Sequence, residues 1–254
     1  MAGHNKWSKI KHKKGANDAK RAKVWTKIIR EVTIAAKMGG ADPDGNPRLR
    51  KAIDDAKAAN MPKDTVQRAV NKGAGGDDDA NYEELVYEGY GPAGVALYVE
   101  CATDNRNRTS ADIRAAFKKR GGNLGASGSV AYMFDKKGQF VFEKAPDDGA
   151  APTEDALLEV GMDHGAEDVV DDGEAFEVTC ESNDFQGLRE AFAAAGFVPA
   201  LAKVAMIPQN MVKTSGDDAA QLLKLVDALE DLDDVQNVWG NFDIDPEELE
   251  KLLG

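Results

Sequence analysis

A composition break at residues 73–81, with the sequence GAGGDDDAN, separates two parts of this chain that have different hydrophobic periods. Before the break, apolar residues recur at the spacing of amphipathic helices. After it, they first alternate at the two-residue spacing of strands. We therefore predict a helical domain before the break and α/β structure after it, with a domain boundary at the break itself.

The charges of the chain are segregated at the same place. Residues 1–76 contain 18 Lys and Arg against 7 Asp and Glu, whereas residues 77–254 contain 14 against 38. The first part therefore attracts polyphosphate and the second part repels it. This pattern predicts that the protein contacts nucleic acid through its N-terminal part.

Composition excludes several protein classes. No window approaches 18 consecutive apolar residues, so we expect no membrane span, and no apolar stretch follows the basic start as in a signal peptide. The two cysteines, Cys101 and Cys180, each lie in a strand-like run, which fits small core residues in a reducing compartment. We expect a cytoplasmic protein without a membrane partner.

The N-terminal part is predicted to be a flexible basic arm followed by three helices. Residues 1–17 have no hydrophobic period, whereas 18–38 have a helical one that ends at a Gly-Gly pair. Asn46 and Pro47 have the residue types of an N-cap and a first helical position. A third helix is predicted from near Pro62 to Gly73.

After the break, strands at 82–90 and 95–102 flank a GPAG turn and predict a hairpin. Thr109 with Asp112 resembles a capping-box variant that would open a helix containing Ile113 and Phe117. A short strand is expected at 130–134.

The segment 135–207 has the order β-α-β-β-α-β, which is the ferredoxin-like split pattern. The helix and strand that follow residue 208 have no partners of their own, so we pair them with the sheet that begins at Tyr82. The prediction is an α+β multidomain protein in which the second α/β domain is inserted into the first. The predicted domains are residues 1–76 (basic and helical), 77–134 with 208–254 (α/β), and 135–207 (ferredoxin-like).

The arm and the first helix supply the candidate nucleic-acid contacts. Their cations can neutralise successive phosphates, and one tryptophan offers a face on which a base can stack. A solvated basic tail and a solvated helix face are the alternatives. The candidate residues are Lys6, Trp7, Lys9, Lys11, Lys13 and Lys14 in the arm, and Lys20, Lys23, Lys27 and Arg30 on the first helix.

A second candidate contact is the segment 103–109, TDNRNRT, which leaves a strand and enters a helix. Arg106 and Arg108 lie there beside backbone donors that can bind an anion. The alternative interpretation is a polar loop that caps the helix, with Asp104 pairing the arginines. The glycine-rich stretch 121–132 contains neither of the two common nucleotide-phosphate motifs.

The sequence offers little for catalysis. It contains no CxxC, HExxH or GxSxG motif, and two of its three histidines lie in the arm. His164 is interpreted as a helix-end or surface residue, and the acidic run 230–234 as a solvated turn. We expect no enzymatic activity, no metal and no cofactor.

Four long stretches of the first half resemble the YebC/PmpR family. Shorter pieces of the second half, AEDV and LEDLDDVQNVW, resemble it as well. The stretches cover most of residues 1–134 and are MAGHNKWSKIKHKK, NMPKDTVQRAVNKG, YEGYGPAGVALYVECATDNRNRT and GGNLGASGSVAYMF.

The resemblance implies a three-domain protein with a helical first domain and two α/β domains. Family members are generally described as DNA-binding transcriptional regulators, and this is the function that we expect. Some bacterial relatives, and the mitochondrial translational activator of cytochrome c oxidase, are instead implicated at the ribosome, where they ease synthesis through proline runs. Ribosomal RNA is thus the alternative partner, and a protein-interaction module without nucleic acid is a third hypothesis. The early position of the GHNKW stretch favours a bacterial cytoplasmic protein, and the oligomeric state stays open.

Overall fold

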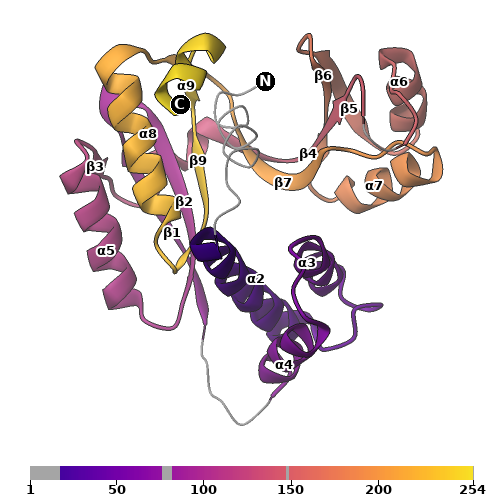
Figure 1. Cartoon of the computed structure of the whole chain (residues 1–254), viewed down its shortest axis with the longest axis horizontal. Coiled ribbons are helices and arrows are strands. Elements are labelled where there is room, and N and C mark those ends of the chain that lie inside the picture. Colours follow the sequence, from indigo (N-terminus) through magenta and orange to yellow (C-terminus); the bar gives the residue numbers. More distant parts are fainter. Residues whose placement is uncertain (1–17, 76–81, 147–148, 254) are drawn as a thin grey trace. The chain divides into compact units, whose positions relative to one another are not determined.

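The computed structural model describes residues 18–75, 82–146 and 149–253. It has the predicted α+β class, with an N-terminal helical domain and two α/β domains, the second of which is inserted into the first (Figure 1). By its internal contacts the described chain forms two compact units, one of residues 133–210 and one of all the other described residues. The basic arm 1–17 and most of the composition break lie outside the described residues.

The helical domain forms as its sequence pattern predicts. Asn46 caps the second helix, because its side-chain oxygen accepts a hydrogen bond from the Leu49 backbone N–H at 3.1 Å. The Asn46 amide also donates to the Ala35 carbonyl at 2.7 Å, which ties this helix start to the preceding helix. Val32, Leu49 and the apolar residues around them form the core. The helices are α2 (Asp18–Gly39), α3 (Pro47–Ala58) and α4 (Lys63–Gly73).

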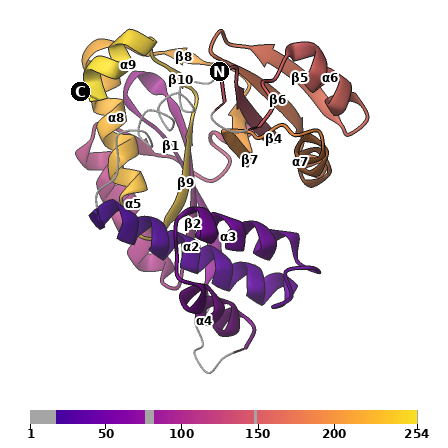
Figure 2. The same cartoon turned by 45° about the vertical axis from the view of Figure 1, so that its right-hand side comes forward.

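The first α/β domain is a four-stranded sheet with the order β3-β1-β2-β9. Strand β2 pairs with β1 and β9 in antiparallel fashion, so the late strand completes the early sheet as predicted. Helices α5 and α8 lie on one face of the sheet (Figures 1 and 2), where Leu97 and Val99 pack with Phe117 and Leu222. The elements are β1 (Glu83–Tyr90), η1 (Pro92–Gly94), β2 (Ala96–Thr103), α5 (Arg106–Lys119), β3 (Asn123–Leu124), α8 (Gly216–Glu230) and β9 (Val235–Gly240).

Some short elements of this domain were not predicted. Two-residue strands pair in parallel, and an amphipathic helix follows them at the C-terminal end of the described chain. Elements of two residues have no period to detect, so no sequence pattern reports them. The two strands are β8 (Val212–Lys213) and β10 (Phe242–Asp243), and the helix is α9 (Pro246–Leu253).

The inserted unit is ferredoxin-like, as predicted. Its fully antiparallel sheet has the order β5-β6-β4-β7, and α6 and α7 lie on one face. Phe140, Phe142 and Phe192 form the centre of its core, with the Phe142 and Phe192 rings 4.8 Å apart. The elements are β4 (Phe134–Glu143), α6 (Glu154–Met162), β5 (Ala166–Asp171), β6 (Ala175–Glu181), α7 (Phe185–Ala194) and β7 (Leu201–Pro208).

Two local predictions were wrong. Helix α5 begins at Arg106 rather than after Thr109, because the Asn105 side chain accepts a hydrogen bond from the Arg108 N–H and caps the helix earlier. The strand expected at 130–134 is instead the 3-10 turn η2 (Ala131–Met133), after which β4 begins.

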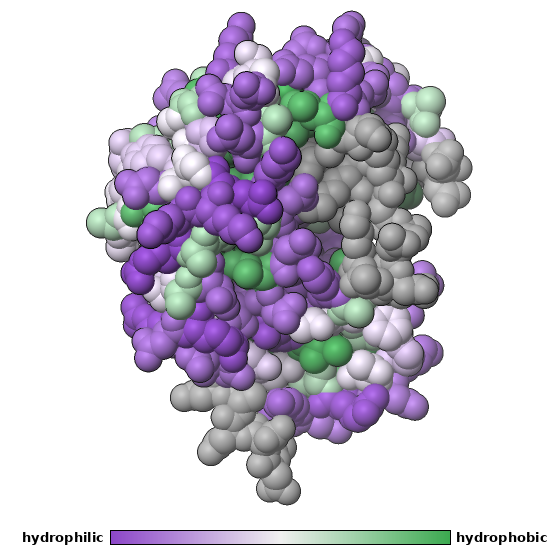
Figure 3. Space-filling model, turned by 60° about the vertical axis from the view of Figure 1, so that its left-hand side comes forward, coloured by the Kyte–Doolittle hydropathy of each residue, from purple (hydrophilic) through white to green (hydrophobic). Residues whose placement is uncertain are grey.

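The surface drawn in Figure 3 is mostly hydrophilic, and hydrophobic residues lie on it in small, separate groups. Within the described part of the chain, no helix has both the length and the apolar character that crossing a membrane requires.

The glycine-rich stretch encloses a carboxylate of the protein itself. Glu88 on β1 is 5% exposed, and its oxygens accept hydrogen bonds from the backbone N–H groups of Gly128, Val130 and Ala131 at 2.6–2.8 Å. Burial opposes ionisation of Glu88, but the three donors outweigh burial and lower its pKa. Gly128 has a φ of +83°, which glycine adopts most readily. We conclude that the ionised Glu88 organises this loop.

The substitution Glu88→Gln tests this role. The amide keeps one acceptor oxygen but turns N–H donors toward backbone N–H donors, so we expect a loss of about 2–3 kcal/mol in the free energy of unfolding. Urea denaturation followed by circular dichroism measures this loss. Glu83→Gln, an exposed position on the same strand, is the matched control, and equal stability of the two variants would contradict the role.

Candidate nucleic-acid interface

The structure describes the side chains of five predicted contact residues. Lys20 lies in α2, but its side chain is outside the described part. Lys23, Lys27 and Arg30 also lie in α2, and Arg106 and Arg108 lie in α5. The arm residues Lys6, Trp7, Lys9, Lys11, Lys13 and Lys14 lie outside the described residues.

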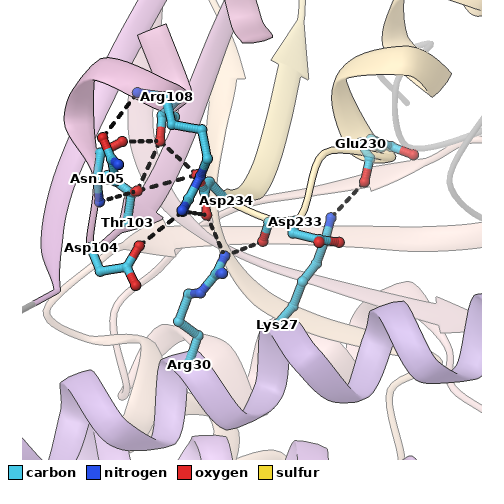
Figure 4. A network of polar contacts seen from close by, with 10 residues as sticks. Lys27, Arg30, Thr103, Asp104, Asn105, Arg108, Glu230, Asp233 and Asp234 are labelled. Carbon is cyan, nitrogen blue, oxygen red and sulfur yellow. Dashed lines mark hydrogen bonds and ion pairs between the residues drawn. The ribbon is translucent and has the colours of Figure 1, made fainter. Parts of the chain in front are cut away.

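The three candidate cations of α2 whose side chains are described contact the turn between α8 and β9, residues 230–234, which we call the acidic turn (Figure 4). The Lys23 Nζ lies 2.9 Å from the Asp231 carboxylate. The Lys27 Nζ donates to the backbone carbonyl of Glu230 at 2.9 Å. This carbonyl lies in the last turn of α8, at the negative end of the helix dipole, where a cation is stabilised.

Arg30 is more enclosed than Lys23. Its guanidinium lies 3.1 Å from the Asp234 carboxylate, and only 11% of the arginine side chain and 7% of the aspartate side chain are exposed. It also donates to the Asp233 backbone carbonyl, and it lies 5.6 Å from the centre of the Tyr82 ring. Arg30 thus joins α2 to the α/β domain through an ion pair, a hydrogen bond to a backbone carbonyl and a cation–π contact with an aromatic ring.

Asp234 is the centre of the network in Figure 4. The Thr109 hydroxyl donates to its carboxylate at 2.6 Å, and the Arg108 guanidinium donates at 3.1 Å. Burial opposes ionisation of Asp234, but these hydrogen bonds and the charges of Arg30 and Arg108 outweigh burial and lower its pKa. Asp234 is therefore a buried anion that is satisfied mainly by the α/β domain.

The two arginines of the TDNRNRT segment differ. Arg108 pairs with Asp104 at 2.8 Å as well as with Asp234, so the pairing that the alternative interpretation expected is present. Arg106 is exposed in the first turn of α5. A helix start presents backbone N–H groups and the positive end of the dipole, so Arg106 stands beside a surface that favours anions.

A second polar contact joins the helical domain to the sheet. Arg48 on α3 binds Glu31 on α2 with two parallel hydrogen bonds of 2.6 and 3.0 Å. The same guanidinium contacts Glu84 on β1 at 2.6 Å. Among the described residues, the apolar core of the helical domain and that of the α/β domain share no member.

A cavity of about 650 Å³ lies beside these contacts. Its lining combines three cations, Lys23, Arg30 and Arg108, with five aspartates and two uncharged residues. Because the aspartates outnumber the cations, the cavity in this arrangement does not favour a phosphate.

The described residues offer little for catalysis. They contain no group of three or more His, Cys, Asp or Glu residues that could hold a metal ion. Both cysteines are buried, and burial raises the pKa of the Cys101 thiol to about 12 and that of Cys180 to about 11. A thiol with such a pKa is a poor nucleophile at neutral pH. His164 is exposed at the end of α6, as predicted.

The role of the acidic turn was missed. We interpreted residues 230–234 as a solvated turn, but Asp234 is 5% exposed and contacts residues more than 120 positions away in the chain. No local pattern marks such a contact. The run of acids in LEDLDD, set against a basic first domain, was the available signal.

Comparisons with known proteins cover nearly the whole chain. Residues 5–76 match the TACO1/YebC protein N-terminal domain, and residues 82–242 match the TACO1/YebC second and third domain. A probable transcriptional regulatory protein of Geotalea uraniireducens is 56% identical over 253 residues, which is 100% of both chains. One of Cupriavidus necator is 57% identical over 243 residues, 95% of this chain and 98% of the relative.

A solved structure is similar as well. The crystal structure of a conserved hypothetical protein from Aquifex aeolicus matches with a TM-score of 0.79 and 41% identity, covering 90% of this chain and 92% of that one.

The substitution Asp234→Asn tests the buried anion. Since the folded-state pKa of Asp234 lies below the ordinary value, its contribution to stability is present above that value and is lost as the pH falls through the folded pKa. We expect a loss of about 1–3 kcal/mol at neutral pH that shrinks as the pH falls below the ordinary pKa of an aspartate, about 4. Urea denaturation across this pH range measures the difference. Asp233→Asn, an exposed side chain in the same turn, is the control, and a loss independent of pH would contradict the assignment.

Proposed function

The chain belongs to the TACO1/YebC family, and from this premise we propose that it is a non-enzymatic, nucleic-acid-binding regulator of gene expression in the bacterial cytoplasm. The names of the curated relatives, probable transcriptional regulatory proteins, support a role in regulation. DNA is the partner that these names favour.

The observation that carries nucleic-acid binding is the segregation of charge. The first 76 residues have a large excess of cations, and the rest of the chain has a larger excess of acids. Phosphate contacts release condensed counterions and supply most of the affinity of such proteins. The acidic α/β domains repel the same phosphates, so we propose that the N-terminal part approaches nucleic acid first.

Each predicted residue has a physical role in this proposal. The arm lysines and Lys20 neutralise phosphates, and Trp7 stacks on an exposed base. Lys23, Lys27 and Arg30 add to the same positive surface when the acidic turn does not hold them. Arg106 binds a second phosphate at the start of α5. Arg108 can bind that phosphate only if it gives up its ion pair with Asp104.

Contacts to the backbone are expected to dominate over contacts to bases. The sequence contains no recognised motif of a base-reading helix, so sequence readout is a minor term in the proposal. Binding should therefore depend strongly on salt and weakly on sequence. The burial of both thiols, which raises their pKa, agrees with a non-enzymatic role.

Neutralising the arm tests the proposal. Replacing Lys9, Lys11, Lys13 and Lys14 by Gln in the full chain removes up to four phosphate contacts. We expect weaker binding to a mixed-sequence DNA duplex and a slope of log K against log salt that is shallower by about three to four. Fluorescence anisotropy over a range of salt concentrations measures both quantities.

The matched control replaces four exposed lysines of the α/β domain, Lys118, Lys119, Lys224 and Lys251, by Gln. It changes the net charge by the same amount at other positions. Equal loss of binding in the two variants would contradict a specific role of the arm and indicate a general effect of net charge.

DNA and the ribosome are separated by sedimentation of cell lysate through sucrose. We expect the protein to remain with chromosomal DNA and to leave that fraction after treatment with DNase. Sedimentation with ribosomes that survives DNase and is abolished by RNase would support the alternative role in translation. Sedimentation with neither would favour a protein-interaction module.

A further inference from the structure

We propose that the polar contacts between the helical domain and the α/β domain form an ionic latch. The latch consists of Lys23, Lys27 and Arg30 on the acidic turn, together with Arg48 on Glu84. When closed, it withholds the α2 cations from nucleic acid, and a competing polyanion opens it. This inference rests on the proposed function and adds a means of regulation to it.

The chemistry of the contact suits a structure that opens. The latch itself consists of ion pairs and charged hydrogen bonds, to which Arg30 adds its contact with the Tyr82 ring, and the two apolar cores share no member. An exposed ion pair such as Lys23–Asp231, with side chains 43% and 67% exposed, contributes little stability and is screened by salt. The Arg30–Asp234 pair is more enclosed, but breaking it and the exposed pairs divides neither of the two apolar cores.

The latch occupies the groups that would bind phosphate. Lys27 donates to a main-chain carbonyl, and Arg30 is engaged with another carbonyl and with Asp234. The acidic turn offers α2 a series of carboxylates and the negative end of the α8 dipole. In charge, this turn imitates a nucleic-acid backbone, so the two ligands compete for the same cations.

Opening leaves no buried charge without a partner. Asp234 keeps Arg108 and Thr109, both of its own domain, when Arg30 withdraws. On the other side, Arg48 keeps its two hydrogen bonds to Glu31 when Glu84 is lost. A buried ion that loses its only partner costs several kcal/mol, whereas each of these ions retains a partner in the same domain. Each of these two ions thus has a partner within its own domain as well as one across the boundary between the domains. This observation distinguishes a latch from a permanent interface.

The energetic consequence follows from the population of the open state. If the α2 cations bind phosphate only when the latch is open, the apparent affinity is reduced by the fraction of open molecules. Weakening the latch from the acidic side should therefore tighten binding, although none of the binding cations has been changed.

The first measurement follows opening without nucleic acid. In the full chain, spin labels are attached to cysteines introduced at Lys63 in α4 and Lys118 in α5, both exposed, while the two native cysteines are buried. We expect one narrow distance distribution at low salt and a broader, shifted distribution near 1 M salt, where the screening length is about 3 Å. The variant Asp231→Lys, which places a cation beside Lys23, should shift the distribution already at low salt.

The second measurement compares Asp231→Lys with Glu250→Lys, an exposed acid on α9 outside the latch. Both variants change the net charge equally. We expect Asp231→Lys to bind a short DNA duplex of mixed sequence about three- to tenfold more tightly than Glu250→Lys does. Adding Lys23→Glu to Asp231→Lys restores an opposite pair and should restore the narrow distance distribution.

The outcomes separate the latch from the proposed function. A distance distribution that changes neither with salt nor with Asp231→Lys would overturn the latch, whatever the binding results. Equal affinity of Asp231→Lys and Glu250→Lys, with opening observed, would overturn its inhibitory role. If the labels respond and no variant binds DNA or RNA, the proposed function and the inhibitory role fail together, while opening itself is upheld.

Discussion

The carboxylate of Asp234 is the point at which the helical domain and the first α/β domain are joined. It stands at the start of the last strand of the first sheet and receives hydrogen bonds from Thr109 and Arg108 on α5. Through Arg30 it also reaches α2. Because this anion is buried, it requires the donors of its own domain, and this requirement brings the start of β9 and helix α5 together, while Arg30 adds a contact from α2.

The segregation of charge along the chain has two consequences that oppose each other. A basic first domain is suited to polyphosphate, but it is equally suited to the acidic turn at residues 230–234, which is covalently attached and always present. The network in Figure 4 shows this internal neutralisation. Binding to nucleic acid is thus a competition between two anions, and the balance depends on how weakly the exposed pairs hold.

The glycine-rich stretch shows that backbone N–H groups of a glycine-rich loop can bind a carboxylate of the same protein instead of a phosphate. Its backbone N–H groups converge on an anion as they do in phosphate-binding loops, but the anion is Glu88. From the sequence we reported only that the two common nucleotide-phosphate motifs are absent from this stretch, and no ligand was predicted. Only the pairing of the strands, which places Glu88 under the loop, identified it.

By itself, the sequence determined the local elements and the order of the domains. The Asn-Pro start of α3, the amphipathic period of α2 and the alternation of β2 are properties of neighbouring residues, so they could be predicted, as could the ferredoxin-like order of the insertion. The start of α5 was misplaced because two capping residues competed within four positions.

The tertiary structure alone decided which charges meet. Arg30 and Asp234 are more than 200 residues apart in the sequence. Their pairing depends on the burial of both side chains and on the last strand, which completes the sheet. Neither of these can be predicted from the residues that neighbour them in the sequence. The sequence therefore predicted the cations of the candidate interface, and only the fold revealed the anion that holds them.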